Sequence, residues 1–335
     1  MNTKRIISLV ASLALVLSLS VGLTGCGDKA AQDDNQGSTD GEGTKYTVGI
    51  CQLVQHEALD AATQGFIDAL NEALPGQVEF QNKNASGDSA NCSTIVNGFV
   101  SDGVDLIMAN ATGALTAAAA ATSDIPILGT SITAYGVALD IDDFNGTVGG
   151  NISGTSDLAP LDQQAAMIQE LFPDAKNVGL LYCSGEPNSV YQIETIRGYL
   201  EDMGYTCEAY AFTDVNDLSS VTQTACDNSD VIYIPTDNTA AGNTETIANV
   251  VLAAGVPVVA GESGICSGCG VATLSISYYD LGYTTGEMAA QILKGEADIS
   301  TMPIEYAPNV TKMYNAANCE ALGITVPDDY TAIEG

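Results

Sequence analysis

Short apolar runs alternate along this chain with segments whose apolar residues recur at helical spacing. Runs of four to eight apolar residues are typical of buried strands, whereas apolar residues three and four positions apart are typical of one helix face. The pattern predicts strands at residues 46–54, 78–84, 104–109, 125–129, 178–183, 207–212, 231–235 and 256–260. It predicts helices at residues 58–74, 90–100, 114–121, 161–171, 190–203, 218–225 and 246–254.

Strands that alternate with helices at this spacing form parallel sheets through right-handed crossovers. A glycine-rich connection after residue 129 separates two sets of about four strands, so the sequence predicts two similar α/β lobes rather than one large sheet. In open parallel sheets, ligands bind at the carboxyl ends of the strands. The residues that directly follow each strand are therefore the first candidates for a binding site.

The first 26 residues have the pattern of an export signal. Lys4 and Arg5 precede an apolar stretch at residues 6–21, and Leu23-Thr24-Gly25-Cys26 supplies small residues for cleavage. The stretch is shorter than the ~20 residues that a membrane-spanning helix needs. Its ending resembles the lipobox of bacterial lipoproteins, which implies removal of residues 1–25 and attachment of lipid to the sulfur of Cys26. The alternative is an ordinary secreted protein with a cysteine near its cleavage site.

The segment after Cys26 has almost no apolar residues. Residues 27–44 are mostly Gly, Asp, Gln, Ser and Thr, a composition that cannot bury enough surface to fold. We expect residues 26–44 to be a lipidated cysteine with a flexible tether. The expected location is the extracellular face of a cell membrane of the Gram-positive type, with the lipid as the anchor.

Acidic residues outnumber basic ones by 42 to 9, which gives a formal net charge of −33. This charge argues against nucleic acids and anionic lipid surfaces as partners, because proteins bind both through Lys and Arg. Arg197 is the only arginine after Arg5, so the usual bidentate clamp for phosphates and dicarboxylates is absent. Any contact with the membrane is expected through the lipid anchor alone.

Hydroxyl, amide and carboxylate residues follow six of the predicted strands. Such a lining suits a neutral or zwitterionic small molecule, and Asp237 or Glu262 could pair with an ammonium group. The alternative interpretation is that these residues only cap helices. The candidate ligand-binding residues are His56, Leu59, Asp60, Thr112, Ser131, Thr133, Asn188, Ser189, Thr236, Asp237, Asn238 and Glu262.

Histidine and cysteine offer little catalytic chemistry. His56 is the only histidine, so a His-rich zinc site is excluded and no metal site or cofactor is expected. Most of the eight cysteines after Cys26 are expected to be free, buried thiols. Cys266 and Cys269 are the exception, because their Cys-X-X-Cys spacing allows a redox dithiol. A local disulfide or paired thiols in a loop at the cleft rim is the favoured interpretation, since glycines surround the pair.

Several sequence segments along the chain resemble segments of the substrate-binding lipoproteins of ABC transporters that have the type I periplasmic-binding fold. The group includes tryptophan- and tyrosine-binding proteins. The resemblance rests on Val48-Gly-Ile-Cys-Gln-Leu-Val-Gln-His56 and Val231-Ile-Tyr-Ile-Pro-Thr-Asp-Asn238, with further phrases at residues 58–60, 99–107, 257–261, 279–282 and 321–324. It covers essentially all of the chain after the tether.

The resemblance implies two Rossmann-like lobes that close on a ligand about a hinge of three crossovers. It places the crossovers near residues 133–150, 276–279 and 305–312, with a helix at 279–293 returning to the first lobe. The implied N-terminal lobe is residues 45–134 plus 279–304. The implied C-terminal lobe is residues 150–276 plus 305–335.

The chain departs from the pattern of the family that it resembles near the expected cleft. Glu57 replaces a proline, Thr133-Ala134-Tyr135 replaces Thr-Asp-Pro, and Ser277 replaces an aspartate. Two carboxylates are thereby lost, which leaves the identity of the ligand open. The phrase Thr236-Asp237-Asn238 is intact, so Asp237 is expected to be the main group that orients the ligand.

These features favour a solute-binding protein without catalytic activity over an enzyme. We expect a monomeric receptor that captures an amino-acid-like ligand, aromatic by resemblance, and delivers it to ABC permease subunits. The alternatives are a sensor subunit, a sugar or nucleoside binder of the same fold, and a thiol-redox enzyme. Tyr135, Tyr191 and Tyr278 are candidates for an aromatic face against the ligand.

Overall fold

The computed structural model describes residues 45–333. The expected signal sequence, the lipidated Cys26 and the tether at residues 26–44 lie outside the described residues. Within residues 45–333, no helix is both long enough and apolar enough to cross a membrane.

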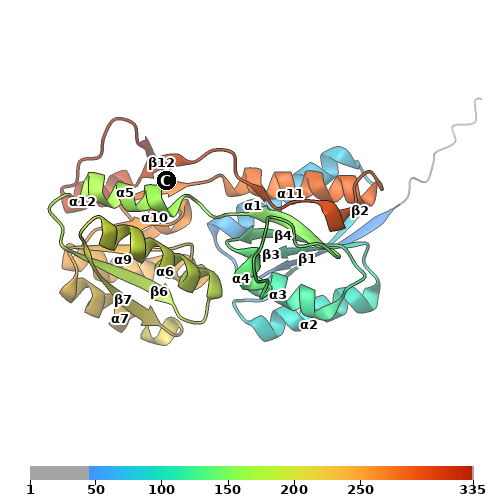
Figure 1. Cartoon of the computed structure of the whole chain (residues 1–335), viewed down its shortest axis with the longest axis horizontal. Helices are drawn as coiled ribbons and strands as arrows, with labels where there is room; N and C mark the ends of the chain where they lie inside the picture. The colour runs from blue at the N-terminus through green and yellow to red at the C-terminus, as the bar shows by residue number, and fades with distance from the viewer. Residues whose placement is uncertain (1–44, 334–335) are drawn as a thin grey trace, which may run out of the picture. The chain divides into compact units, whose positions relative to one another are not determined.

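The first sheet has six strands, all parallel, in the order β11-β5-β4-β3-β1-β2. Helices cover both of its faces (Figure 1). α1 and α11 pack with Val48 and Ile50 of β1 on one face, while α2 and α3 pack with Cys51 on the other, as the alternation of a strand requires. The elements are β1 (Tyr46–Gln52), α1 (Glu57–Ala73), β2 (Val78–Asn84), α2 (Ser89–Asp102), β3 (Leu106–Asn110), α3 (Thr112–Ala121), β4 (Ile127–Ile132), α4 (Tyr135–Ala138), β5 (Ile152–Ser156), α11 (Tyr278–Leu293), the 3-10 helix η1 (Ile299–Thr301) and β11 (Glu305–Tyr306).

The second sheet has seven strands in the order β13-β12-β10-β9-β8-β6-β7, and only the β10–β12 pair is antiparallel. α5, α6 and α12 pack on one face, and α7, α9 and α10 pack on the other. The elements are α5 (Leu161–Leu171), β6 (Asn177–Cys183), α6 (Pro187–Asp202), β7 (Thr206–Phe212), α7 (Val215–Asn228), β8 (Val231–Ile234), α8 (Asn238–Ala241), α9 (Thr244–Ala254), β9 (Val258–Ala260), α10 (Ser263–Cys269), β10 (Ala272–Ser275), β12 (Thr311–Tyr314), α12 (Ala316–Leu322) and β13 (Thr331–Ala332).

The predicted α/β class with two parallel-dominated sheets is confirmed. The boundary between the lobes differs from the expectation, because β5 and β11 both belong to the first sheet. Residues 150–156 and 305–306 were expected in the C-terminal lobe. The chain leaves the first sheet at residues 157–160, after β5, rather than at 133–150, and it crosses again at 276–277 and at 307–310.

α1 and α11 approach each other closely through glycines. A Cβ atom on Gly282 would overlap the carbonyl oxygen of Ala62, and one on Gly65 would overlap the carbonyl oxygen of Tyr279. Backbone therefore lies directly against backbone where the two helices meet. α11 follows the crossing at 276–277, so this contact fixes one end of that crossing to the first lobe.

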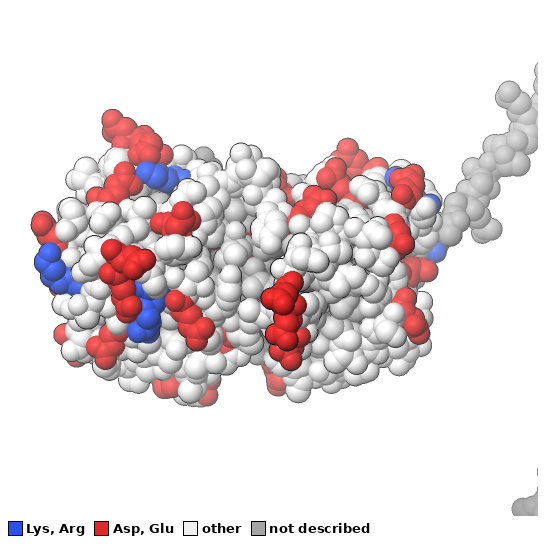
Figure 2. Space-filling model, viewed as in Figure 1, with Lys and Arg blue, Asp and Glu red and all other residues white. Residues whose placement is uncertain are grey.

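Charged side chains lie mainly on the surface. On the face shown in Figure 2, Asp and Glu are scattered over both lobes and Lys and Arg are few. Among the described residues the salt bridges are those of Lys312 with Glu170 and Asp329, each at 2.9 Å. Most carboxylates in this part of the chain therefore have no basic partner.

Candidate functional site

A small polar cavity lies where the carboxyl ends of strands from both sheets meet. It measures about 20 Å³, close to the roughly 10–15 Å³ that one water molecule needs. Both lobes contribute side chains to it. We call it the central cavity, and it is lined by His56, Leu59, Ser131, Thr133, Asp157, Asn188, Thr236, Asp237, Asn238, Ala241, Glu262 and Tyr278.

Two polar contacts join the lobes across this cavity. His56 Nε2 lies 3.3 Å from Asn238 Oδ1, and Thr133 Oγ1 lies 3.5 Å from Thr236 Oγ1. Burial lowers the pKa of His56, so the imidazole favours its neutral form. These contacts are few and uncharged, and a ligand with polar groups can replace them.

Asp157 is a buried carboxylate directly after β5. Thr133 Oγ1 donates to its Oδ1 at 2.9 Å, and the Tyr278 hydroxyl donates to its Oδ2 at 2.9 Å. Burial raises its pKa above the ordinary value, and the two hydroxyl donors oppose that rise. Both partners are neutral hydroxyls, and Tyr278 stands at the end of the crossing at 276–277.

Asp237 accepts hydrogen bonds from two backbone groups. Its Oδ2 accepts from the backbone N–H of Cys183 at 2.7 Å, and its Oδ1 accepts from that of Ala240 at 2.8 Å. Asp237 thus caps α8 and ties it to the end of β6. Burial, with a smaller effect from Glu186, raises its pKa to about 7.

Glu262 caps α10 as Asp237 caps α8. Its carboxylate accepts from the backbone N–H of Gly264 at 2.6 Å and from that of Ile265. It is the N-cap of α10, and burial raises its pKa to about 7. The alternative interpretation, that the acidic residues after the strands are helix caps, therefore holds for both Asp237 and Glu262.

Ser131 has a polar atom without a partner. Its hydroxyl is buried, lines the central cavity and forms no hydrogen bond. Its backbone has φ of 56°, a left-handed conformation that is uncommon outside glycine. A buried hydroxyl without a partner is costly, so it is a group that a ligand would satisfy.

The titratable side chains that line the central cavity are mainly acidic. Three buried carboxylates line it, and no Lys or Arg is among its lining residues. Buried charges are stable only when they are paired. The cavity therefore favours a ligand that brings a positive group.

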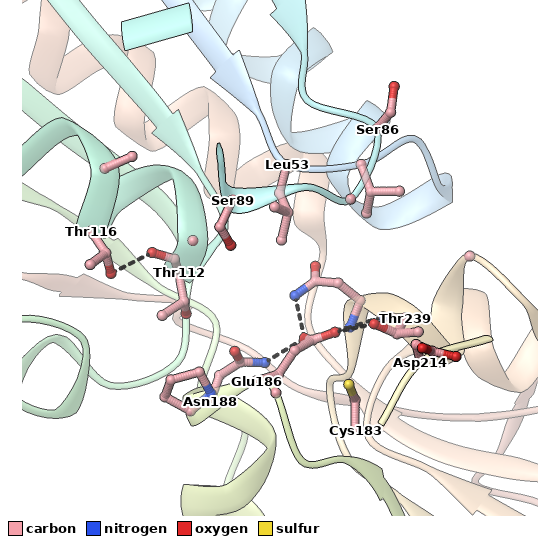
Figure 3. A pocket seen from close by; sticks show the side chains of 18 of the residues that line it. Leu53, Ser86, Ser89, Thr112, Thr116, Cys183, Glu186, Asn188, Asp214 and Thr239 are labelled. Carbon is pink, nitrogen blue, oxygen red and sulfur yellow. Dashed lines mark hydrogen bonds between the residues drawn. The ribbon is translucent and has the colours of Figure 1, made fainter. Parts of the chain in front are cut away.

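A larger groove adjoins the central cavity and shares Asn188 and Asn238 with it (Figure 3). It has a volume of about 710 Å³ and is lined by apolar and hydroxyl side chains, Leu53, Thr112 and Thr239 among them. Glu186 lies in the middle of the view, where its Oε1 accepts from Thr239 N at 2.8 Å and its Oε2 from Asn238 N at 2.9 Å. We call this the side groove.

Nine of the twelve candidate residues line the central cavity. Thr112 lines the side groove instead, and Ser189 is buried in α6 without lining either space. Asp60 is exposed and accepts a hydrogen bond from Gln52 Nε2 at 2.6 Å.

Sequence reasoning missed Asp157 as a polar lining residue. It directly follows β5, so the rule that selects residues after strands would have found it if that strand had been recognised. Of the three tyrosines expected to form an aromatic face, Tyr278 lines the cavity, whereas Tyr135 is buried and donates to the carbonyl oxygen of Thr155. Tyr191 lines neither the cavity nor the side groove.

Cys266 and Cys269 lie on the short helix α10, not in a loop at the cleft rim, and both are buried and free. The expected local disulfide is therefore absent from the structure. Burial raises the pKa of both thiols, which is the opposite of what a reactive thiolate needs. No cluster of metal-binding side chains occurs within residues 45–333.

Comparison with known proteins identifies the family. Residues 47–333 match the family model of ABC transporter substrate-binding proteins. The chain is 32% identical over 333 residues to the tyrosine-binding protein of Clostridioides difficile, a match that covers 96% of this chain and 93% of that protein.

Two solved structures have similar identity. The first is an ABC domain from Streptococcus pneumonia in complex with L-Trp, at 31% identity and a TM-score of 0.82, covering 87% of this chain and all of that one. The second is the ligand-free, open form of a substrate-binding protein with adhesive properties from Clostridium difficile, at 32% identity and a TM-score of 0.67, covering 86% of this chain and 99% of that one. The chain belongs to the family of ABC transporter substrate-binding proteins.

Proposed function

We propose that this protein captures an aromatic amino acid between its two lobes and delivers it to the permease of an ABC importer. The observation that carries the proposal is the central cavity, where polar side chains from both sheets converge at the carboxyl ends of the strands. The names of the related proteins, one tyrosine-binding and one in complex with L-Trp, support an aromatic amino acid as the ligand.

Binding on this proposal requires the lobes to separate and close again. The central cavity, at about 20 Å³, is far too small for an amino acid. Opening would break the His56–Asn238 and Thr133–Thr236 contacts, and a ligand would then bridge the same groups. The higher TM-score to the L-Trp complex than to the ligand-free, open structure supports a closed arrangement of the lobes here. The ligand shifts the population toward the closed form because it contacts both lobes only in that form.

The acidic lining supports a ligand with an ammonium group. The unpartnered Ser131 hydroxyl and the first turn of α1, where the N-cap His56 makes no side-chain capping bond, offer donors for a carboxylate. Tyr278 supplies an aromatic wall. A zwitterion with an aromatic side chain meets all three features.

Thermal unfolding with a panel of ligands tests the proposal. A ligand at 100 times its Kd stabilises the folded state by about 2.7 kcal/mol, which is a shift of roughly 5 °C or more for a protein of this size. We expect this shift with L-tyrosine or L-tryptophan and none with glucose or adenosine. The absence of any shift with the aromatic amino acids at millimolar concentration would refute the proposal.

We also propose that lipid on Cys26 holds the receptor beside its permease, as a monomer on the extracellular face. The sequence pattern of residues 1–26 supports this, and the polar composition of residues 27–44 suits a tether between lipid and domain. Mass spectrometry of the full chain recovered from membranes should find Cys26 as the N-terminal residue with acyl chains attached. A Cys26 without lipid would contradict a lipid anchor.

A further inference from the structure

The three carboxylates that line the central cavity differ in what holds them. Each oxygen of Asp237 accepts from a backbone N–H, and Glu262 likewise accepts from two backbone N–H groups. These backbone donors are fixed by β6 and by the helices α8 and α10, so neither carboxylate can turn toward a ligand without uncapping a helix. Both are already used in holding the fold together.

Asp157 does not cap a helix. Its donors are the hydroxyls of Thr133 and Tyr278, and a hydroxyl can rotate its hydrogen toward another acceptor without loss of backbone structure. No Lys or Arg lines the cavity that could pair with it, and His56, which does line it, favours its neutral form because burial lowers its pKa. Of the three buried carboxylates, Asp157 is therefore the one that can exchange its hydrogen-bond donors for those of a ligand.

The position of Asp157 also suits a group that senses the ligand. It begins the crossing at residues 157–160, and its partner Tyr278 is the first residue of α11, after the crossing at 276–277. Thr133, the other partner, follows β4 and lies 3.5 Å from Thr236 of the second lobe. A charge bound at Asp157 thus acts directly on two of the three segments about which the lobes must turn.

We propose that Asp157 is the residue that binds the ammonium group of the ligand, and that Asp237 and Glu262 hold the short helices α8 and α10. This inference rests on the proposed function, because it assigns a role within the same site. An ammonium group brings three donors and a positive charge, which together satisfy the Asp157 carboxylate more fully than two neutral hydroxyls do. The assignment replaces the sequence-based expectation that Asp237 is the main group orienting the ligand.

Calorimetric titration with two matched probes tests the assignment. L-tyrosine carries the ammonium group, and 3-(4-hydroxyphenyl)propionate is the same molecule without it. Wild-type protein should prefer L-tyrosine by about 10- to 150-fold, the range expected for a hydrogen bond to a charged group. Asp157→Asn should lose this preference, whereas the matched variants Asp237→Asn and Glu262→Gln should unfold at lower temperature and keep it.

The outcomes separate this inference from the proposed function. If wild-type protein binds L-tyrosine and Asp157→Asn keeps the preference within threefold, or if Asp237→Asn abolishes it instead, the assignment is wrong while the function stands. If wild-type protein binds neither L-tyrosine nor L-tryptophan, the function fails and the assignment with it. Should Asp157→Asn not fold, a crystal structure of wild-type protein with L-tyrosine decides. The ligand nitrogen should lie within about 3.2 Å of Asp157, and a nitrogen bound to Asp237 or Glu262 instead would overturn the assignment.

Discussion

The glycine contact between α1 and α11 leads to a prediction in which one substitution has opposite effects at two positions. Gly282→Ala places a Cβ against the carbonyl oxygen of Ala62, which is backbone and cannot rotate away. Gly98→Ala, in the interior of α2, places a Cβ in open space, with no atom within 4 Å. Both changes gain about 1 kcal/mol of helix propensity. Only the first must also separate two helices.

The magnitude follows from these two contributions. Overpacking costs about 1–3 kcal/mol, and the upper end applies at Gly282 because the obstacle is backbone. We therefore expect Gly282→Ala to lower the free energy of unfolding by about 2 kcal/mol after the gain in propensity is subtracted. Gly98→Ala should raise it by about 0.5–1 kcal/mol.

Thermal unfolding of the ligand-free protein, followed by circular dichroism, measures both variants. At roughly 2–4 °C per kcal/mol, the midpoint should fall by about 4–8 °C for Gly282→Ala and rise by about 1–4 °C for Gly98→Ala. Equal stabilisation by the two substitutions would show that α1 and α11 are not packed backbone to backbone. The account of how α11 is fixed to the first lobe would then be wrong.

Three further predictions concern charge and thiols. Asp237 and Glu262 have pKa values raised to about 7, so between about pH 4 and 7 the folded ligand-free protein holds protons that the unfolded chain has released. The free energy of unfolding should therefore fall as the pH rises through this range. Asp237→Asn should flatten this dependence in urea titrations, and an unchanged slope would contradict the raised pKa of Asp237. Lys312→Met should lower the free energy of unfolding by less than about 1 kcal/mol in the same titrations, because the Lys312 side chain and both of its carboxylate partners are at least 30% exposed. A loss of about 3 kcal/mol would show that these salt bridges are stronger than exposed pairs normally are. Cys266 and Cys269 should react with a thiol reagent only as fast as the protein unfolds, since both are buried with raised pKa values, and rapid labelling of the native protein would contradict this.

The regular part of the fold was predictable because its strands and helices carry clear periodicity. The strand at residues 78–84 and the helix at residues 161–171 were placed with the ends that the structure shows, and most other elements shifted by only a few residues. One face of the helix is buried, and Val78 and Phe80 of the strand are half-buried against the core, so the apolar residues recur with the period of each element.

The sequence of β5 shows no apolar pattern from which the strand could be predicted. Its sequence Ile-Ser-Gly-Thr-Ser has one apolar side chain, although all five residues are buried. Part of the reason is Tyr135, whose hydroxyl lies against the backbone of Gly129 and Gly154, where any Cβ would collide with it. A side chain from outside the strand therefore explains why position 154 is glycine, and local patterning cannot reveal this.

The candidate site was predictable by position but not by role. The rule that ligands bind after strands found nine of the twelve residues that line the central cavity. It could not show that Asp237 and Glu262 direct their oxygens to backbone N–H groups, because that depends on where α8 and α10 begin. Nor could it show that Asp157 has only hydroxyl partners, since Tyr278 is 121 residues away.

The central claim is that the cavity between the lobes binds one aromatic amino acid. Isothermal titration of the purified protein with L-tyrosine and L-tryptophan tests it most directly. We predict saturable binding of one molecule per chain, with a negative heat-capacity change as apolar surface is buried. No heat of binding from either amino acid at millimolar concentration, with the protein shown to be folded, would contradict the claim.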